Sequence, residues 1–538
     1  MNKRTITALV LIFALVLSSL GAAGLVRDTS YGPVLGAQEG EALAWLSVPY
    51  GKAPVGELRW KAPQDPEPWS EVYDATYSRP MSLQLSGGVA AGSDDCLKLD
   101  IYAPADAEGL PVLVYIHGGN NQTGSSRQFS GAELAARNDI IFVSLSYRLG
   151  LLGFNCLPAL LDEENPTGNF TVLDFAKALD WVKENIAAFG GDPGNVTVSG
   201  FSAGGRDVMA LLISPLFEGK FQKAISFSGG MTTADETLSA RKIAKALAPL
   251  AVADGVAETE EEAAQWLLQD TEEVRDYLYS LPAESLCVIG DAGIRMSVFP
   301  HLYTDGVALP EEGFETESYN SVPLIMLTGT TEFSFFALGD SNYIDDEITL
   351  SGEDKGKAMA FAIANGSKMY GFFNAESSAE RMYSSYDAPI YLCTIEYGAP
   401  GSSHEIPLFG AFHGVFVPML ATEHGYMGIT DWSEPGFEAM KATFNSYLRN
   451  FLYTGDPNGD GLPEWAEWEP ETKLSIVMDG EEAVSATVAT SYDEIMDAMD
   501  ADTSLSEEAK QVAIRNALNG RWFSAALDER YQNKDLWQ

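Results

Sequence analysis

Residues 195–213, NVTVSGFSAGGRDVMALLI, place one serine between glycines where a strand-like segment meets a helix-like one. The first part alternates apolar and polar residues, as strands do, and the part after Gly205 has the composition of a helix. Gly200, Ser202 and Gly204 form the pattern G-x-S-x-G, which is typical of a tight strand-to-helix turn that exposes a serine hydroxyl. We therefore predict that Ser202 is a nucleophile. The pattern is short, so an ordinary turn is the alternative.

Other apolar segments of the chain have the character of buried strands, and most of them end in glycine or polar turn residues. They are PVLVYIHGG (111–119), IIFVSLSYRLG (140–150), KAISFSGG (223–230), VPLIMLTGTT (322–331) and APIYLCTIEYG (388–398). Between two of them, residues 171–190 carry apolar residues at helical spacing and end at Gly190, a helix stop. The fold class predicted is α/β, with a large, mainly parallel sheet covered by helices on both faces. Ligands of such sheets lie at the carboxyl ends of the strands.

The overall composition limits the partners of the chain. Of its 538 residues, 46% are hydrophobic, so it can bury a large core, and its formal net charge is −44. This charge argues against nucleic acid as a partner, because phosphate binding needs clustered Lys and Arg. It weakly favours neutral or cationic small-molecule substrates over anionic ones.

The first 26 residues differ from the rest. Lys3 and Arg4 precede an uncharged apolar run that ends in small residues around Ala22 and Ala23. This is the pattern of an export signal, and the run is also long enough to be an N-terminal membrane anchor. We predict a signal peptide over 1–26, with contact to the membrane only if it is retained, and an exported or cell-surface protein. The remainder shows no repeat or linker, and its acidic segments 254–278 and 491–518 are predicted as surface helices, so 27–538 is predicted to be one catalytic domain.

Attack by a serine creates negative charge on an oxygen, which needs backbone amide donors nearby. The amide of Ala203, at the start of the predicted helix, is one candidate. A second set follows the strand that ends at His117, where Gly118 and Gly119 let the backbone approach a ligand. A plain glycine turn is the alternative for this loop.

A serine also needs a base, and the base an orienting acid. With this type of turn the chain order is serine, acid, histidine, which leaves His404, His413 and His424. His404 and His424 lie in polar segments, whereas His413 lies in the apolar, glycine-flanked segment LFGAFHGVFVPML, so His413 is predicted as the base. Glu332 follows the carboxyl end of a predicted strand and is predicted as the acid, with an ordinary surface glutamate as the alternative.

With these motifs the chain resembles the type-B carboxylesterases, the group that includes cholinesterases and some lipases. The resemblance extends over nearly all of the chain after residue 26 and rests on a series of segments in the family's order. These are YGPVLG (31–36), VPYGKAPVGELRWKAPQDPEPW (48–69), SDDCLKLDIYAP (93–104), VYIHGG (114–119), SYRLGLLGF (146–154), the segment 168–205, LISPLFEGKFQKAISFSGG (212–230), GAFHG (410–414) and YTGDPNGDGLPEW (453–465).

The resemblance implies an α/β-hydrolase fold with the active site in a gorge at the strand carboxyl ends. It implies an ester substrate, no cofactor and no metal. Carried over residue by residue, it implies a triad and three oxyanion-hole amides, namely Ser202, Glu332 and His413 with Gly119, Asn120 and Ala203.

Three positions depart from the family pattern. Phe201 stands where the family often has glutamate, Phe333 where glycine usually follows the acid, and Asn120 where the oxyanion loop usually has a third glycine. Asparagine is among the few other residues that tolerate positive φ. We therefore expect position 120 to have positive φ or a crowded approach to the acyl group.

The family pattern also bears on the cysteines and on one acidic loop. Cys96 matches a family disulfide cysteine, but the region of its usual partner contains Met81 instead, so Cys96 is expected to stay reduced. Cys96, Cys156, Cys287 and Cys393 allow three pairings, and we predict no disulfide framework. The loop with Asp456, Asn458, Asp460, Gly461 and Glu467 has calcium-site spacing, yet it matches an ordinary family turn, which is the interpretation we prefer.

Other functions remain as alternatives. A cholinesterase-like binding domain without activity would lack a member of the triad, and this chain keeps all three. Amide hydrolysis or acyl transfer to an alcohol would use the same site. Four aromatic residues near the motifs, Phe299, Phe333, Phe335 and Phe336, are expected either to line an apolar acyl pocket or to belong to the core.

Overall fold

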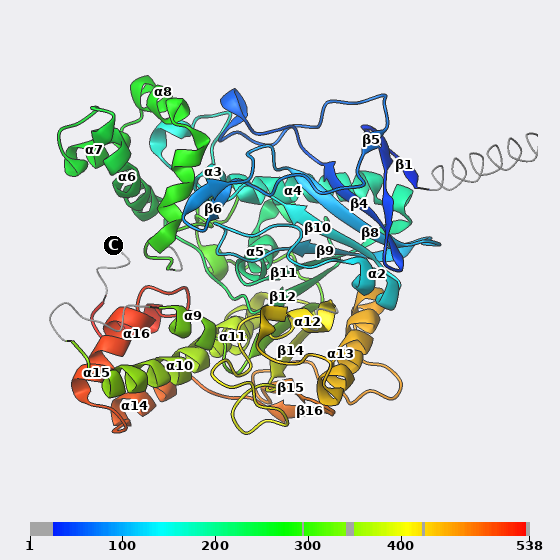
Figure 1. The fold of residues 1–538 in the computed structure, drawn as a ribbon, viewed down its shortest axis with the longest axis vertical. Coiled ribbons are helices and arrows are strands. Elements are labelled where there is room, and N and C mark those ends of the chain that lie inside the picture. Colours follow the sequence, from blue (N-terminus) through cyan, green and yellow to red (C-terminus); the bar gives the residue numbers. More distant parts are fainter. Residues whose placement is uncertain (1–24, 293–294, 341–348, 422–425, 534–538) are drawn as a thin grey trace, which may run out of the picture.

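The computed structural model describes residues 25–292, 295–340, 349–421 and 426–533. Its centre is an eleven-stranded sheet with the order β16-β15-β14-β13-β12-β11-β9-β10-β8-β4-β3 (Figure 1). Its strands are β3 (Ala37–Glu39), β4 (Ala42–Pro49), β8 (Lys98–Pro104), β9 (Leu110–Ile116), β10 (Ile141–Ser146), β11 (Gly191–Phe201), β12 (Lys223–Phe227), β13 (Leu324–Gly329), β14 (Ile390–Ile395), β15 (Leu474–Asp479) and β16 (Glu482–Thr487).

The sheet is parallel in the middle and antiparallel at both ends. From β10 to β15, each neighbouring pair of strands runs parallel, and every predicted strand segment falls in this part. The pairs β10–β8, β8–β4, β4–β3 and β15–β16 are antiparallel. The prediction of a large, mainly parallel sheet is confirmed.

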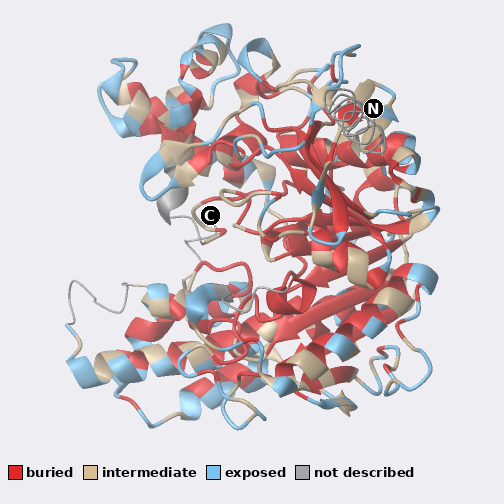
Figure 2. Ribbon diagram, turned by 45° about the vertical axis from the view of Figure 1, so that its right-hand side comes forward, coloured by how far each residue is buried: buried red, intermediate tan, exposed pale blue. Residues whose placement is uncertain are grey.

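Helices cover both faces of the sheet. Side chains of β9 alternate between two cores, because successive residues of a strand point to opposite faces. Val112, Val114 and Ile116 pack in the core that also contains α4 (Phe170–Asn185) and α5 (Ala203–Ile213). Leu113 and Tyr115 pack in the core that contains α2 (Ala132–Asn138) and α13 (Pro435–Thr454). Figure 2 shows the buried residues concentrated along the sheet and on the inner sides of these helices.

Two groups of helices lie beyond the sheet in Figure 1. One consists of α6 (Glu236–Ala253), α7 (Glu260–Leu267) and α8 (Glu272–Ser280). The other gathers α9 (Ser334–Gly339), α10 (Gly352–Asn374), α14 (Tyr492–Ala501), α15 (Glu507–Val512) and α16 (Ala525–Arg530) around a third core. The acidic segments predicted as helices are α7 with α8, and α14 with α15 and the π-helix Ala513–Leu518.

The remaining elements are short. They are the strands β1 (Val26–Thr29), β2 (Gly32–Leu35), β5 (Tyr73–Asp74), β6 (Gln84–Ser86) and β7 (Val89–Ala91), and the helices α3 (Gly150–Gly153), α11 (Glu376–Met382) and α12 (Val417–Leu420). The helix predicted over 171–190 is α4 followed by a 3-10 turn, and Gly190 ends it in the left-handed conformation with φ +87°.

The strand order reverses between β9 and β11. The chain passes from β9 to β10 on one side and then returns to place β11 on the other side of β9. In open α/β sheets, the crevice at the carboxyl ends of such a pair is where ligands bind. The loop that starts at His117 follows β9 and Ser202 follows β11, so this crevice is the place to examine for a site.

The N-terminal segment predicted as a signal peptide lies almost entirely outside the described residues. Of this segment the structure describes only Leu25 and Val26, and Val26 pairs with Leu35 in the β1–β2 ladder. Within the described ranges, no helix has the length and apolarity needed to cross a bilayer.

All four cysteines lie within the described residues as free thiols. Cys96 is buried in the core, and this burial raises the pKa of its thiol to about 12. A buried thiol of this kind is unreactive, because the thiolate is the reactive form.

We therefore predict that reductant does not weaken the fold. Thermal melts with and without dithiothreitol should have midpoints within about 2 °C of each other, since no covalent loop is opened on reduction. A large drop of the midpoint on reduction would show that a disulfide contributes to stability after all.

Candidate active site

Ser202 lies at the apex of the turn from β11 into α5. Its backbone has φ +59° and ψ −117°, a conformation that costs energy for a residue with a side chain and that clusters at functional sites. Its amide donates to the carbonyl oxygen of Phe227 (2.9 Å), which ties the turn to the end of β12. Ser202 is partly exposed, whereas its neighbours Phe201 and Ala203 are buried. The predicted nucleophile is thus presented from a rigid, buried support.

The glycines around Ser202 allow a very close approach of three chain segments. A Cβ atom on Gly200 would lie 2.1 Å from the carbonyl oxygen of Gly204, and one on Gly204 would lie 2.1 Å from that of Ile116. On the neighbouring loop, a Cβ on Gly118 would lie 2.9 Å from the Ser202 Cβ atom. The glycine pattern therefore brings β9, β11 and α5 together at the crevice, as the motif predicts.

Glu332 is a fully buried carboxylate just beyond the end of β13. Its Oε1 atom accepts hydrogen bonds from the hydroxyl of Ser228 (2.5 Å), the amide of Gly329 (2.7 Å) and the hydroxyl of Thr328 (3.2 Å). These donors offset the cost of burying the charge. The surface-glutamate alternative is wrong, because the side chain is buried.

The second oxygen of Glu332 faces His413. The Oε2 atom lies 2.5 Å from the Nδ1 atom of His413, and both side chains are buried. The residues are 81 positions apart in the sequence, so the fold alone brings them together. This contact fixes the orientation of the imidazole ring and leaves Nε2 as the atom that can exchange a proton.

Aromatic side chains surround the His413 ring. The ring centroids of Phe201, Phe336 and Tyr370 lie 4.7, 5.1 and 5.3 Å from that of His413. The Nε2 atom is buried and has no hydrogen-bond partner among the described residues. The Ser202 side chain is within hydrogen-bonding reach of Tyr370, whose pKa burial raises well above its usual value, so that Tyr370 stays a neutral phenol. Catalytic hydrogen bonds are often long or absent in unliganded sites and form with substrate.

The loop after β9 has the backbone shape expected for it. Gly119 has φ +112° and Asn120 has φ +55°, so the expectation of positive φ at position 120 is confirmed. The side chain of Asn120 accepts a hydrogen bond from the guanidinium of Arg206 (2.7 Å). Below the loop, His117 stacks on Tyr147 with 4.4 Å between ring centroids, and burial lowers the pKa of His117 to about 4, so this histidine is neutral.

The structure adds residues that the sequence reasoning missed. Tyr370 on α10 and Arg206 on α5 adjoin the site, and Ser228 and Thr328 bind Glu332. Ser228 could have been found by the strand-end rule, since it directly follows β12. Tyr370 carried no signal, because it comes from a helix in the middle of a long, motif-free segment.

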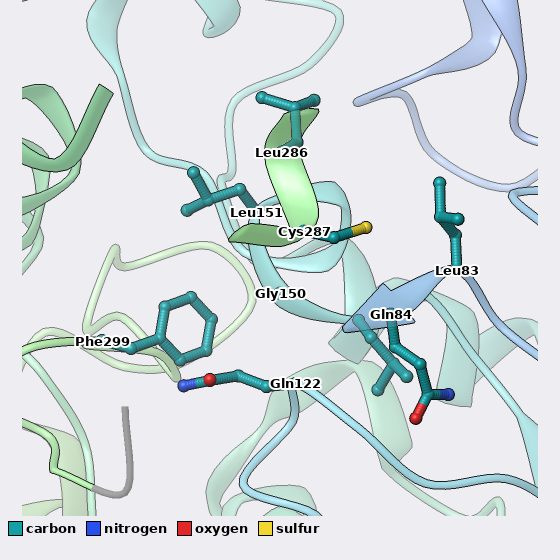
Figure 3. A pocket seen from close by; sticks show the side chains of 9 residues that line it. Leu83, Gln84, Gln122, Gly150, Leu151, Leu286, Cys287 and Phe299 are labelled. Atoms are coloured by element: carbon teal, nitrogen blue, oxygen red, sulfur yellow. The ribbon is translucent and has the colours of Figure 1, made fainter. Parts of the chain in front are cut away.

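The four phenylalanines considered for an acyl pocket lie in different surroundings. Phe336 packs against His413, Phe333 is fully buried in the third core and Phe335 is largely exposed. Phe299 is buried, and Figure 3 shows its ring beside the side chain of Gln122 at a small cavity near the loop after β9. Phe336 is therefore the one that contacts the predicted base directly.

The other candidates lie elsewhere. His404 stacks on Tyr397 and its Nε2 lies 3.2 Å from the Thr430 hydroxyl, and His424 lies outside the described residues. In the acidic loop, the side chain of Asn458 bonds Asp456 and the backbone of Trp465. No group of three His, Cys, Asp or Glu side chains arranged to hold a metal ion occurs in the described part of the chain.

Comparison with known proteins identifies the family of the chain. A model of the carboxylesterase family matches residues 23–365. The chain belongs to this family. This carboxylesterase is 31% identical to para-nitrobenzyl esterase of Bacillus subtilis over 500 residues, which are 85% of the chain and 95% of that protein. It is 32% identical to the liver carboxylesterase of Sus scrofa over 519 residues, 83% and 88% of the two chains.

Solved structures support the fold of the carboxylesterase. A structure of a PNB esterase superimposes with a TM-score of 0.70 at 29% identity and covers 86% of this chain and 97% of its own. The carboxylesterase EST55 of Geobacillus stearothermophilus superimposes with a TM-score of 0.69 at 28% identity, with coverages of 86% and 98%. The protein therefore has the α/β-hydrolase fold, and it hydrolyses carboxylic esters.

The positive φ of Asn120 leads to a testable expectation. Asn120→Gly should keep kcat on a short aryl ester within about tenfold, because glycine adopts this backbone and keeps the amide. Asn120→Val should lower kcat by roughly 100-fold, because a β-branched residue is strained at positive φ and displaces the loop. Melting curves of both variants serve as the folding control. Equal activity of the two variants would contradict a role of this backbone in the site.

Proposed function

We propose that the enzyme cleaves esters through an acyl-enzyme formed on Ser202, with His413 as general base, Glu332 as the orienting acid and the amides of Gly119, Asn120 and Ala203 as the oxyanion hole. The observation that carries the proposal is the 2.5 Å contact between Glu332 Oε2 and His413 Nδ1 in a buried aromatic setting beside Ser202. A buried carboxylate held by three donors has no evident structural need for a histidine partner.

The first half of the reaction transfers the acyl group. The Ser202 hydroxyl turns from Tyr370 towards His413, which takes its proton on Nε2 as the oxygen attacks the ester carbonyl. The carbonyl oxygen becomes negative and is stabilised by the loop amides and by the amide at the start of α5. His413 then returns the proton to the leaving alcohol. Glu332 stabilises the imidazolium between these steps.

The second half regenerates the enzyme. Water takes the place of the alcohol, His413 removes its proton, and the hydroxide attacks the acyl-enzyme through a second oxyanion. The carboxylic acid leaves as the proton returns to Ser202. Neither half of the reaction requires a cofactor. His413 carries each proton, and groups of this chain stabilise each charge that develops.

We also propose that the enzyme is exported. The support is the basic start, the apolar run and the small residues of segment 1–26, which together form the pattern of a cleavable signal. N-terminal sequencing of the protein from a culture supernatant should begin within or just after this segment. Detection of the intact N-terminus in the membrane fraction would favour an anchor.

Substitutions in the triad test the mechanism. Ser202→Ala and His413→Gln should each lower kcat/KM for an aryl ester by about 10⁴-fold or more without a large change of the melting midpoint. His404→Gln is the matched control, because His404 also follows Ser202 in the chain but binds Thr430 away from the site, and its activity should stay unchanged. A fluorophosphonate should form its adduct on Ser202, as mass spectrometry can show. An adduct on another serine, or none, would refute the proposal, and the second result would favour a binding domain.

A further inference from the structure

Arg206 is a buried cation one helical turn beyond Ser202. Its side chain is 1% exposed, and burial lowers the pKa of the guanidinium, although an arginine stays charged at neutral pH. No carboxylate lies within ion-pairing distance of it among the described residues. Two other arginines are as deeply buried, Arg148 and Arg521, and each is paired with a carboxylate, Asp174 at 2.6 Å and Asp340 at 2.8 Å. Of these three deeply buried arginines in the described residues, Arg206 is the one that forms no ion pair with a carboxylate.

The contacts of Arg206 place it at the edge of the proposed oxyanion hole. One Nη2–H group donates to the Asn120 side chain (2.7 Å), and Nη1 lies 3.5 Å from the Met296 sulfur. The guanidinium lies over the Trp522 ring, 4.7 Å from its centroid. Trp522 in turn packs on Tyr370 and Phe336, two of the rings around His413. The cation therefore adjoins both the oxyanion loop and the aromatic surroundings of the base.

The nearest carboxylates do not neutralise this charge. Asp207 is next in the chain, but its Oδ1 accepts from the Asn121 side chain (2.8 Å) and its Oδ2 is buried without a partner. Burial raises the pKa of Asp207 to about 7, so it is only partly ionised near neutral pH. Glu332 uses both oxygens for His413 and its three donors. His301 is buried with its Nε2 atom unpartnered. Burial and the charge of Arg206 keep the pKa of His301 well below its usual value, so this histidine is neutral.

We propose that Arg206 anchors an anion subsite beside the oxyanion hole, and that the enzyme prefers esters that carry a carboxylate a few bonds from the ester group. The guanidinium matches a carboxylate because it offers parallel N–H donors in a planar fork. The distance from the ester is short because Arg206 binds Asn120, whose amide is assigned to the hole. This proposal rests on the proposed function, since it places the substrate by the oxyanion hole.

A preference for anionic esters must arise locally at Arg206, because the net charge of the chain is −44. The acidic surface repels anions at low salt, but at about 0.15 M salt such repulsion is screened beyond about 8 Å. A pair formed at a buried guanidinium is screened much less. The composition of the chain alone favours neutral or cationic substrates, whereas the proposed subsite favours anionic esters.

The other role open to Arg206 is purely structural. If its only task is to hold Asn120 in place, its removal must weaken the hydrolysis of every ester to the same degree. If it binds the substrate, its removal must affect charged esters alone or far more strongly. The ratio of kcat/KM for a charged ester to that for a neutral counterpart separates the two roles.

The experiment uses two matched pairs of esters at about 0.15 M ionic strength. In the acyl pair, 4-nitrobenzyl hydrogen succinate is compared with 4-nitrobenzyl succinamate. In the alcohol pair, 4-(acetoxymethyl)benzoate is compared with 4-(acetoxymethyl)benzamide. We expect the charged member of one pair to have a kcat/KM about 10- to 100-fold higher in the wild-type enzyme, as for a hydrogen bond to a charged group. The pair that responds shows which half of the ester lies at Arg206.

Three variants complete the test. Arg206→Met should bring the ratio of kcat/KM for the charged and neutral esters close to one, whatever loss the two esters share, and Arg206→Lys should keep part of the preference. Arg449→Met is the matched control, because it removes one positive charge from a more exposed site on α13 and should leave the ratio unchanged. Succinate should inhibit hydrolysis of a neutral ester by the wild type competitively, which tests the subsite even if the Met variant does not fold.

Two results would overturn the proposal. One is equal hydrolysis of charged and neutral esters by the wild type, and the other is an equal loss on both esters in Arg206→Met. Failure of the proposed function has a different signature, since Ser202→Ala would then hydrolyse all four esters regardless of their charge.

Discussion

Helix α5 passes the end of strand β9 so closely that no side chain fits between them, and the site depends on this contact. A Cβ atom at Gly204 would lie 2.1 Å from the carbonyl oxygen of Ile116, well inside any allowed distance. Where α5 starts this close to β9, Ser202 lies next to Gly118 in its unusual backbone conformation, and Ala203 is the first residue of α5. Arg206 follows one turn later and reaches Asn120 on the facing loop.

The second constraint is the buried pair of Glu332 and His413. A buried carboxylate needs hydrogen-bond donors, because burying it without them is costly. Here the carboxylate is also held by Ser228, Gly329 and Thr328, so the acid stays in place even when His413 moves its proton. The fold thus holds the acid rigidly at one strand end and the serine at another. The histidine lies on the segment between β14 and α12, and its Nδ1 atom contacts the acid.

The amino-acid sequence was sufficient for the framework of this site and insufficient for its lining. The parallel strands and the elbow were predictable because apolar runs and close glycines have local causes. The antiparallel strands at the sheet edges were not expected, because the segments that form β3, β4, β8 and β16 were not among the apolar runs identified as strands. The contacts of Tyr370 with Ser202 and of Arg206 with Asn120 join residues whose sequence separation carries no pattern. Asn120 was noticed as a departure from the family, but the arginine that it binds was not.

The central claim is that Ser202 attacks an ester whose carbonyl oxygen lies among the amides of Gly119, Asn120 and Ala203. The most direct measurement is a crystal structure of the enzyme inactivated with diethyl 4-nitrophenyl phosphate, which mimics the tetrahedral intermediate. The account predicts phosphorus bonded to the Ser202 oxygen, with the phosphoryl oxygen about 2.7–3.1 Å from these amides and His413 Nε2 facing the ester oxygen. A phosphoryl oxygen that points away from the loop after β9, or phosphorus on another residue, would contradict it.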